Sequence, residues 1–309
     1  MDLSIIIVNY KMKDMVSRCL DSLRALETSV EFEVILVDND PADGSAEHFS
    51  NNYGWTTFIG NRENAGFAKA CNQGLARSAG ECVLFLNPDT EMPAGTLDRM
   101  KAFLAARPEV GIAGCRTVNA DGSLEPSVYR FPTPWRTFAD AFYLGRWFGG
   151  YEVPPESLNG DRTVEVICGA CLFARRRVLE EIGSFDEEFW MYGEDVELCY
   201  RAYKAGWRVC YVDSCEVVHK RGERHLAEDA YHDIARISYN HYKWIFCFYR
   251  KHYPPWANRA LRRIMAAQIA PKIWSRKRKL ARGDDSRNNV ERLKGLTRVM
   301  DEFVRGGKA

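Results

Sequence analysis

The sequence lacks a large net charge, a long hydrophobic run and a repeated glycine or proline pattern. Its 43 basic and 42 acidic residues leave a net charge of +1 over 309 residues, which argues against a nucleic-acid-binding protein. No apolar stretch approaches the ~18–20 residues of a membrane-spanning helix, and we find no signal-peptide pattern at the start. The 23 glycines and 12 prolines follow no period, which excludes a collagen-like chain.

Metal and redox motifs are also scarce. Of ten cysteines, Cys168 and Cys171 form the single C-x-x-C, and no Cys/His pair completes it at zinc spacing. We therefore interpret the cysteines as reduced residues of apolar segments. No G-x-G-x-x-G follows the first predicted strand, which argues against a dinucleotide-dependent dehydrogenase.

What the sequence does contain is an alternation of buried strands and helices. Short apolar runs predict strands at residues 3–8, 33–37, 56–59, 82–86, 111–115, 164–168, 171–174 and 208–212. Helical periodicity predicts helices at residues 15–26, 65–79, 97–106, 176–182 and 194–205. This order predicts an α/β fold with a Rossmann-like, mostly parallel sheet flanked by helices.

Two regions depart from this alternation. Residues 119–162 are rich in proline and aromatic residues, and we interpret them as an insertion or lid within a catalytic domain of residues 1–225. Residues 226–309 are predicted to form a helical, basic C-terminal extension. In its last part, residues 286–304 carry an apolar helical face that either packs on the body or pairs with a second copy as a homodimer.

The charge is divided unevenly between these regions. Residues 240–282 contain 12 Lys and Arg and no Asp or Glu, whereas residues 1–239 contain 25 basic and 37 acidic residues. Aromatic residues interleave with the basic ones, a composition typical of a membrane surface. A helical domain with a solvated basic face is the alternative, and nucleic acid is not expected as a partner. We therefore expect a cytoplasmic protein, peripheral on the inner face of the cell membrane if this segment binds lipid.

Polar residues follow three of the predicted strands. Asn9, Asp38 and the Asn87–Asp89 turn should converge, because ligands bind at the carboxyl ends of parallel strands. Asp89 at an open strand end suits a divalent cation that bridges two phosphates. A turn or a helix cap is the alternative reading of each motif alone.

A further polar group opens the helix at residues 194–205. Glu194 and Asp195 stand in its first turn, where the helix dipole favours acidic residues. Trp190 and Tyr192 lie just before them. Aromatic faces cover the apolar side of a sugar ring while a carboxylate takes a hydroxyl proton, so this segment is a candidate sugar site.

Taken in order, these motifs resemble the inverting family 2 glycosyltransferases of the GT-A fold. The resemblance is strongest to the bacterial branch that includes rhamnosyltransferases of cell-surface polysaccharide assembly. The matching motifs are SIIIVNY at 4–10, VDND at 37–40, NAGFA at 64–68 with Asn72, NPD at 87–89, GACLF at 169–173, GSFD at 183–186 and GED at 193–195. They cover about residues 1–220.

The resemblance implies a role for each matching residue. Asp38 resembles the carboxylate that holds the nucleotide base, and Asp195, beside Glu194, resembles the catalytic base. The implied nucleotide-sugar contacts are Asn9, Asn64, Gly66, Phe67, Asn72 and Asn87, and the implied acceptor or sugar contacts are Trp190 and Tyr192. Asp89 resembles the metal-binding aspartate of a DxD motif whose first position is here Asn87. His219 resembles a residue that reaches the metal or diphosphate, with a structural histidine as the alternative; His225 is a weaker candidate.

The implied activity is sugar transfer with inversion. A nucleoside diphosphate sugar, dTDP-rhamnose or a UDP-sugar, would donate to a hydroxyl of a glycan or lipid-linked glycan, with Mg²⁺ or Mn²⁺ at the diphosphate. A sugar-1-phosphate nucleotidyltransferase is one alternative, but the residues after the first strand contain no glycine-rich phosphate loop. A non-catalytic glycan-binding protein on the same fold is the other, and the joint presence of Asp38, Asp89 and Asp195 argues against it.

Overall fold

The structure, a computed structural model, describes residues 1–40, 44–220 and 234–306, without the side chains of residues 146 and 148. The chain forms two compact units, each described separately here. Unit 1 contains Met1–Arg130, Glu152–Trp190 and Glu194–Ala230, and unit 2 contains Phe131–Tyr151, Met191–Gly193 and Tyr231–Ala309. The predicted domain boundary at residue 225 lies outside the described residues.

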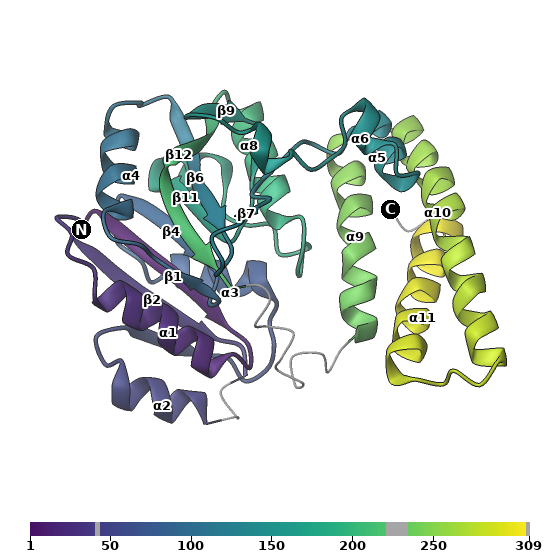
Figure 1. The fold of residues 1–309 in the computed structure, drawn as a ribbon, viewed down its shortest axis with the longest axis horizontal. Coiled ribbons are helices and arrows are strands. Elements are labelled where there is room, and N and C mark those ends of the chain that lie inside the picture. The colour runs from purple at the N-terminus through teal and green to yellow at the C-terminus, as the bar shows by residue number, and fades with distance from the viewer. Residues whose placement is uncertain (41–43, 221–233, 307–309) are drawn as a thin grey trace. The chain divides into compact units, whose positions relative to one another are not determined.

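Unit 1 is built on a mixed sheet with the strand order β3-β2-β1-β4-β11-β6-β12-β5 (Figure 1). Its strands are β1 (Leu3–Asn9), β2 (Phe32–Asp38), β3 (Thr57–Gly60), β4 (Cys82–Leu86), β5 (Thr90–Glu91), β6 (Val110–Val118), β7 (Leu124–Glu125), β9 (Arg162–Val164), β11 (Cys171–Arg175) and β12 (Arg208–His219). Strands β1 to β4 run parallel, as does β12 beside β6, whereas β11 is antiparallel between β4 and β6. The predicted α/β fold with a mostly parallel sheet is confirmed.

Helices cover both faces of this sheet because its strands are apolar on both sides. The helices of unit 1 are α1 (Lys13–Arg24), α2 (Ser45–Asn52), α3 (Phe67–Leu75), α4 (Thr96–Ala105), α7 (Arg176–Ile182) and α8 (Glu194–Lys204). On one face, Val16 and Leu20 of α1 and Met100 of α4 share a core with Ile5. On the other, α3 lies so close that a β-carbon at Gly74 would stand 2.6 Å from Ile6 Cγ2.

Strand β12 is longer than predicted and bends near its middle. We predict a strand that ends at residue 212, whereas the structure continues it to His219. Its pairing with β6 is irregular between Val212 and Glu216 and resumes to Val218, and Val218 and His219 also pair with β5. Such an irregularity bends a strand. The bend carries His219 to the edge of the sheet where β4 ends.

The predicted insertion of residues 119–162 divides between the two units. Its outer parts form β7, β8 (Val128–Tyr129), the short helix η2 (Pro155–Ser157) and β9 in unit 1, where β8 pairs with β10 (Val166–Ile167). Its middle part, Phe131–Tyr151, belongs to unit 2. The segment therefore contains short strands and three short helices, which the proline content did not indicate.

Unit 2 is helical. It consists of α5 (Pro134–Ala141), α6 (Gly145–Phe148), α9 (Ile234–His252), α10 (Pro255–Ala281), α11 (Arg287–Val299) and the closing turn η5 (Met300–Arg305). Phe246 and Phe248 of α9, Leu261 of α10 and Val299 of α11 are fully buried. The apolar face of the C-terminal segment thus packs within its own unit, one of the two predicted alternatives. None of the helices in the described ranges combines the length and hydrophobicity that crossing a bilayer requires.

Candidate functional site

The predicted site residues of unit 1 gather at one edge of the sheet. Asn9 ends β1, Asp38 ends the neighbouring β2, and Asn87 follows β4 on the other side of β1. Because β11 is antiparallel, it begins at this same edge, with Cys171 opposite Leu86. The strand spacing places the ends of β2 and β4 about 10 Å apart.

Asp38 is completely buried at this edge. One carboxylate oxygen accepts hydrogen bonds from the Asn9 amide and from the Asp40 backbone N–H, both at 3.0 Å, and the other accepts from the Ser45 hydroxyl. These donors are neutral and belong to the chain itself. Asp38 therefore joins the ends of β1 and β2 to the start of α2, and its predicted contact with a nucleotide base stays a prediction.

The segment from Asn64 to Phe67 links this cluster to the aromatic segment before α8. Asn64 Oδ1 accepts from the Gly66 backbone N–H at 3.0 Å, and the Gly66 carbonyl accepts from Asn39 at 3.3 Å. The Phe67 backbone N–H donates to the Trp190 carbonyl at 2.9 Å. Gly66 has a φ of +92°, and a β-carbon there would lie 2.4 Å from Trp190 Cδ1. Only glycine fits this position.

Asn72 holds the backbone rather than an open site. On α3 it donates to the Phe185 carbonyl at 2.8 Å and accepts from the Phe185 N–H at 3.1 Å. It also donates to the Glu187 carboxylate. These contacts fix the loop that leads into the Trp190 segment, and a direct contact between Asn72 and a nucleotide sugar stays a prediction.

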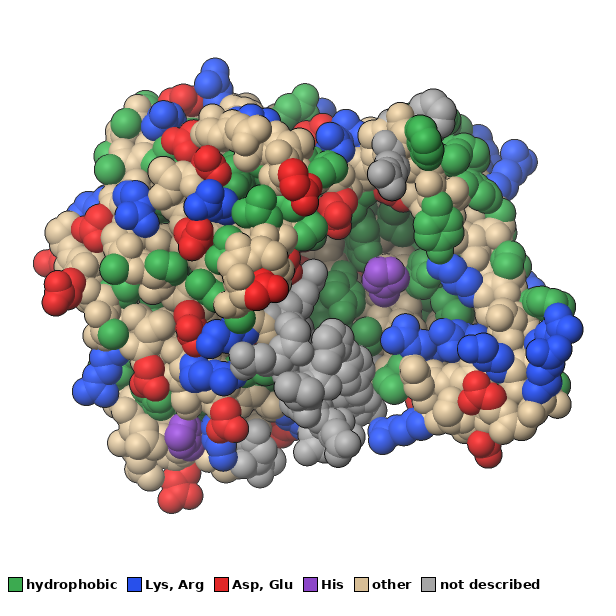
Figure 2. Space-filling model, viewed as in Figure 1, with side chains coloured by type: hydrophobic (Ala, Val, Ile, Leu, Met, Phe, Trp, Pro, Cys, Tyr) green, Lys and Arg blue, Asp and Glu red, His purple; other side chains and the backbone are tan. Residues whose placement is uncertain are grey.

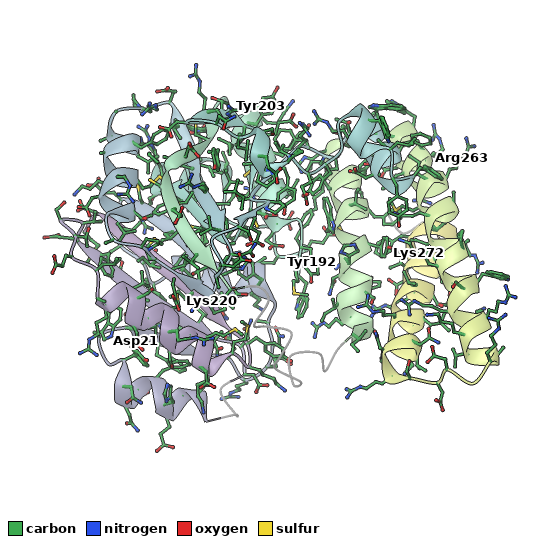
Figure 3. The ribbon with its side chains drawn as sticks, in the orientation of Figure 1. Asp21, Tyr192, Tyr203, Lys220, Arg263 and Lys272 are labelled. Atoms are coloured by element: carbon green, nitrogen blue, oxygen red, sulfur yellow. The ribbon has the colours of Figure 1, made fainter. Side chains whose placement is uncertain are left out.

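Asp89, His219 and Glu125 form a buried chain of hydrogen bonds at the end of β4. His219 Nε2 lies 3.1 Å from Asp89 Oδ1, and His219 Nδ1 lies 2.8 Å from Glu125 Oε2. All three side chains are at most 6% exposed. Burial by itself would lower the pKa of His219, but the bonds to Asp89 and Glu125 outweigh it and raise that pKa to about 9. Lys220, labelled in Figure 3, fixes the arrangement by donating its backbone N–H to the Asp89 carbonyl at 2.7 Å.

Asp89, His219 and Glu125 do not form a metal site in which the protein supplies every ligand. Their arrangement fits better a cation that also binds the oxygens of a diphosphate. Among the described residues, no three His, Cys, Asp or Glu side chains gather around one point where a metal ion would sit. Asp89 and Glu125 lie on opposite sides of the imidazole ring. A metal-bound histidine commonly donates its second N–H to a carboxylate, and Glu125 lies where that carboxylate is needed. Mg²⁺ or Mn²⁺ commonly takes one or two protein ligands and fills the rest with phosphate oxygens and water.

Glu125 is a site residue that the sequence did not reveal. It lies 94 residues before His219 on a two-residue strand, inside the segment interpreted as an insertion. It pairs with Thr117 of β6, and β6 pairs on its other side with β12, the strand that ends at His219. No spacing or motif signals such a contact, because it depends on the pairing of three strands.

Asp195 lies at the same edge, in the first turn of α8. One carboxylate oxygen accepts from the Gly169 backbone N–H at 2.9 Å and the other from the Val196 N–H at 2.8 Å. Burial raises the pKa of Asp195 above its usual range, and these backbone bonds oppose part of the rise. The neighbouring Ala170 carbonyl accepts from the Asn87 N–H at 2.9 Å. Asp195 and Asp89 therefore flank one short stretch of paired backbone.

The remaining predicted residues are more scattered. Glu194 is buried near Cys71 of α3, where burial and the Glu194 charge together raise the pKa of the thiol. Trp190 lies in unit 1, whereas Tyr192 belongs to unit 2, where its ring meets His241 edge-on at 6.0 Å. His225 lies outside the described residues.

Comparison with known proteins defines the class of enzyme. Solved structures of similar fold include the mannosyltransferase PcManGT from Pyrobaculum calidifontis with GDP-Man and Mn²⁺, at a TM-score of 0.54 and 18% identity over 96% of this chain and 84% of that one. GalNAc-T7 with UDP, GalNAc and Mn²⁺ matches at 0.55 and 14% identity, over 71% of this chain and 43% of that one. These are glycosyltransferases, and the likeness establishes the fold.

The sequence comparison then gives the family. Residues 4–183 match the model of glycosyl transferase family 2, and the chain belongs to this family. It is 30% identical to the N-acetylglucosaminyl-diphospho-decaprenol L-rhamnosyltransferase of Mycobacterium tuberculosis, over 87% of this chain and 90% of that protein. It is 27% identical to the rhamnosyltransferase WbbL of Escherichia coli, over 70% and 82%. The protein is a glycosyltransferase that takes its sugar from a nucleotide sugar.

Proposed function

We propose that this protein transfers rhamnose from dTDP-rhamnose to a hydroxyl of a lipid-linked glycan, with inversion at the anomeric carbon. The observation that carries the proposal is the single sheet edge that holds Asp89, His219 and Asp195 around the paired segments at Asn87 and Ala170. The names of the similar proteins from M. tuberculosis and E. coli support the sugar, and the first also supports the acceptor. A UDP-sugar is the alternative donor.

In this proposal Asp89 and His219 Nε2 hold a divalent cation, Mg²⁺ or Mn²⁺. When bound, the cation neutralises the diphosphate that leaves as the sugar is transferred. Glu125 orients the imidazole by accepting from Nδ1, which leaves Nε2 beside Asp89, where the two side chains would hold the cation. The buried position of all three side chains strengthens their interaction with charge by excluding water.

Asp195 is the proposed general base. It takes the proton from the acceptor hydroxyl, and the resulting oxygen attacks the sugar from the side opposite the diphosphate. Backbone N–H groups of Gly169 and Val196 fix the carboxylate, so little rearrangement is needed during the reaction. Its raised pKa makes it a better proton acceptor than an ordinary aspartate. General-base catalysis of this kind contributes about 10²–10⁴-fold.

The donor nucleotide is proposed to lie along the ends of β1 and β2. Asn9 and Asp38 border this position, and the Asn64–Phe67 segment closes one side of it. Asn87 precedes the diphosphate position at Asp89. Trp190 is the proposed sugar contact from unit 1, and Tyr192 is retained as a candidate acceptor contact.

The test is a donor screen with the purified full-length chain and Mn²⁺. Nucleoside diphosphate release and product formation are measured for dTDP-rhamnose, UDP-sugars and GDP-sugars, with a short-chain prenyl diphosphate glycan as acceptor. We expect dTDP-rhamnose to give the fastest transfer, and the anomeric configuration of the product to be inverted. Transfer with retention, or equal transfer by an Asp195→Asn variant, would refute the mechanism. Faster transfer from a UDP-sugar would refute the assignment of rhamnose alone.

A further inference from the structure

Large exposed hydrophobic side chains concentrate in unit 2. Of eleven such residues in the described parts of the chain, seven belong to this unit. Four of them lie on or between α5 and α6, namely Trp135, Phe142, Tyr143 and Trp147. Tyr143 is 81% and Trp147 is 78% exposed. Figure 2 shows hydrophobic side chains gathered over α5 and α6. A monomeric soluble surface rarely exposes so many large apolar groups together unless they bind something.

The backbone holds these aromatic groups outward. Trp135, Phe138 and Phe142 follow one another along α5, with ring centroids 5.7 and 4.9 Å apart. Tyr143 then adopts a φ of 61°, a left-handed conformation that costs a non-glycine residue about 1 kcal/mol or more. Strained residues persist only where the surrounding structure fixes them. The exposed segment between α5 and α6, with Phe142, Tyr143 and Trp147, is the aromatic tip. The surrounding structure holds this tip in a defined conformation.

Asp140 supplies much of that fixation. Its carboxylate accepts from the Tyr151 backbone N–H at 2.8 Å, which closes the segment after α6. A β-carbon on either Gly145 or Gly150 would lie 2.4 Å from Asp140 Oδ1, so a larger residue at either position would displace the Asp140 side chain. The Asp140 carboxylate thus stabilises the turn on its buried side, while the aromatic side chains of the turn are exposed.

Helix α10, which packs against α5 in the same unit, carries a basic face. The hydroxyls of Thr137 on α5 and Tyr249 on α9 lie 2.8 Å apart, and Asn258 at the start of α10 donates to the Tyr249 carbonyl. Nearby on α10, Trp256, Arg259 and Arg263 are exposed at positions i, i+3 and i+7, which share one helix face. Arg263, labelled in Figure 3, projects from the side of α10 away from α9.

The same face continues along α10 without opposing charge. Trp274 lies 18 residues after Trp256, which is five helical turns, and the two are 62% and 58% exposed. Residues 234–281 contain no Asp or Glu. This face of α10 therefore carries two exposed tryptophans, with exposed arginines between them. Its positive charge and its aromatic rings lie on the same side of the helix.

We propose that the aromatic tip of α5–α6 and the outer face of α10 bind an anionic lipid bilayer. The side chains of Phe142, Tyr143 and Trp147 would enter the headgroup region, where aromatic rings are favoured. Arg259 and Arg263 would contact lipid phosphates, and their charge complements that surface. This surface goes beyond the proposed sugar transfer, and lipid binding is measured without donor or acceptor, so that either proposal can fail alone.

The test is flotation of the full-length chain with vesicles of phosphatidylcholine, with and without phosphatidylglycerol. We expect binding only to the anionic vesicles. Arg259→Gln with Arg263→Gln should weaken it about 30-fold, since each basic residue near such a surface contributes about fivefold. Phe142→Ala with Trp147→Ala should weaken it at least tenfold. Unchanged circular dichroism and urea denaturation show that each variant is folded, whether or not it binds nucleotide.

Matched variants of unit 1 serve as controls. They show whether vesicle binding depends on this particular surface or on the overall charge and hydrophobicity of the protein. Arg24→Gln with Arg77→Gln removes the same charge from exposed positions, and Trp55→Ala with Tyr203→Ala removes exposed aromatic rings. Both should bind vesicles as the natural chain does. Equal loss in these controls, or undiminished binding by the α5–α6 and α10 variants, overturns the proposal. So does an aromatic variant that changes only the oligomeric state in sedimentation, because the tip would then contact protein.

Discussion

Asp38 ends one of the two parallel strands that flank β1 and Asp89 follows the other, yet their surroundings differ. Asp38 is enclosed by an amide, a hydroxyl and a backbone N–H, all neutral donors of the chain. Asp89 faces the imidazole of His219, which a second carboxylate holds from behind. In our proposal a cation with its diphosphate would take the place of the proton between Asp89 and His219. The amide, the hydroxyl and the N–H beside Asp38 are neutral, and none of these three is an imidazole. The fold of the sheet thus sets the position of each carboxylate. The side chains that contact the carboxylate determine its chemical role.

The largest effect is expected at Asp195, the third carboxylate of this edge. Asp195→Asn keeps the size of the side chain but removes the proton acceptor, and its single amide oxygen can accept only one of the two backbone N–H bonds. We expect transfer to fall by about 10²–10⁴-fold, with nucleoside diphosphate binding unchanged. Steady-state transfer rates and calorimetry check both parts. Asp21→Asn, an exposed change on α1, serves as the control, and a variant rate near that control would remove Asp195 from the role of base.

Asp38→Ala sharpens the comparison through stability. The change leaves the Asn9 amide, the Asp40 N–H and the Ser45 hydroxyl buried without their shared acceptor. We expect a loss of about 3 kcal/mol in the free energy of unfolding, because each unsatisfied buried group costs about 1–3 kcal/mol. Urea denaturation measures it, with Asp21→Ala as the control. A stable Asp38→Ala protein that has lost nucleotide binding would reverse our assignment, making Asp38 chiefly a ligand contact.

Glu125→Gln tests whether His219 is held for a cation. Glutamine can still accept from His219 Nδ1, but it lacks the charge that makes the imidazole a stronger ligand. We expect Mn²⁺ affinity, measured by calorimetry with nucleoside diphosphate present, to fall about tenfold. Glu216→Gln, at the Arg116 ion pair nearer the surface, should leave that affinity unchanged. Equal affinity in the Glu125 variant and the natural chain would limit Glu125 to a structural role.

The smallest expected effect is on pH dependence. Asp195 acts as a base only when ionised, and burial raises its pKa above the ordinary value of 3.8. Transfer should therefore decline as pH falls through that raised pKa, at a higher pH than an unperturbed aspartate would give. The pH profile of kcat at saturating donor and acceptor measures this. A rate that stays constant down to pH 4 would contradict the raised pKa.

Much of the fold and part of the site follow from local sequence. Periodicity indicated the longer strands and most helices of unit 1, though not α2, β5, β7 or β8, and strand ends placed Asn9, Asp38 and Asp89 on one edge. Glu125 could not be predicted, because its contact with His219 depends on β6, β7 and β12 pairing side by side. The sequence also did not indicate that Trp190 and Tyr192 belong to different units. Only Met191–Gly193 belong to unit 2 at this point, and no pattern in so short a segment shows which unit it packs in.

The central claim is that Asp89, and not Asp38, binds the cation that contacts the diphosphate. Calorimetry of dTDP binding with and without Mn²⁺ tests it most directly, on the natural chain, Asp89→Ala and Asp38→Asn. We predict that Mn²⁺ tightens dTDP binding at least tenfold in the natural chain and in Asp38→Asn, and has no effect in Asp89→Ala. Equal tightening by Mn²⁺ in Asp89→Ala would contradict the account.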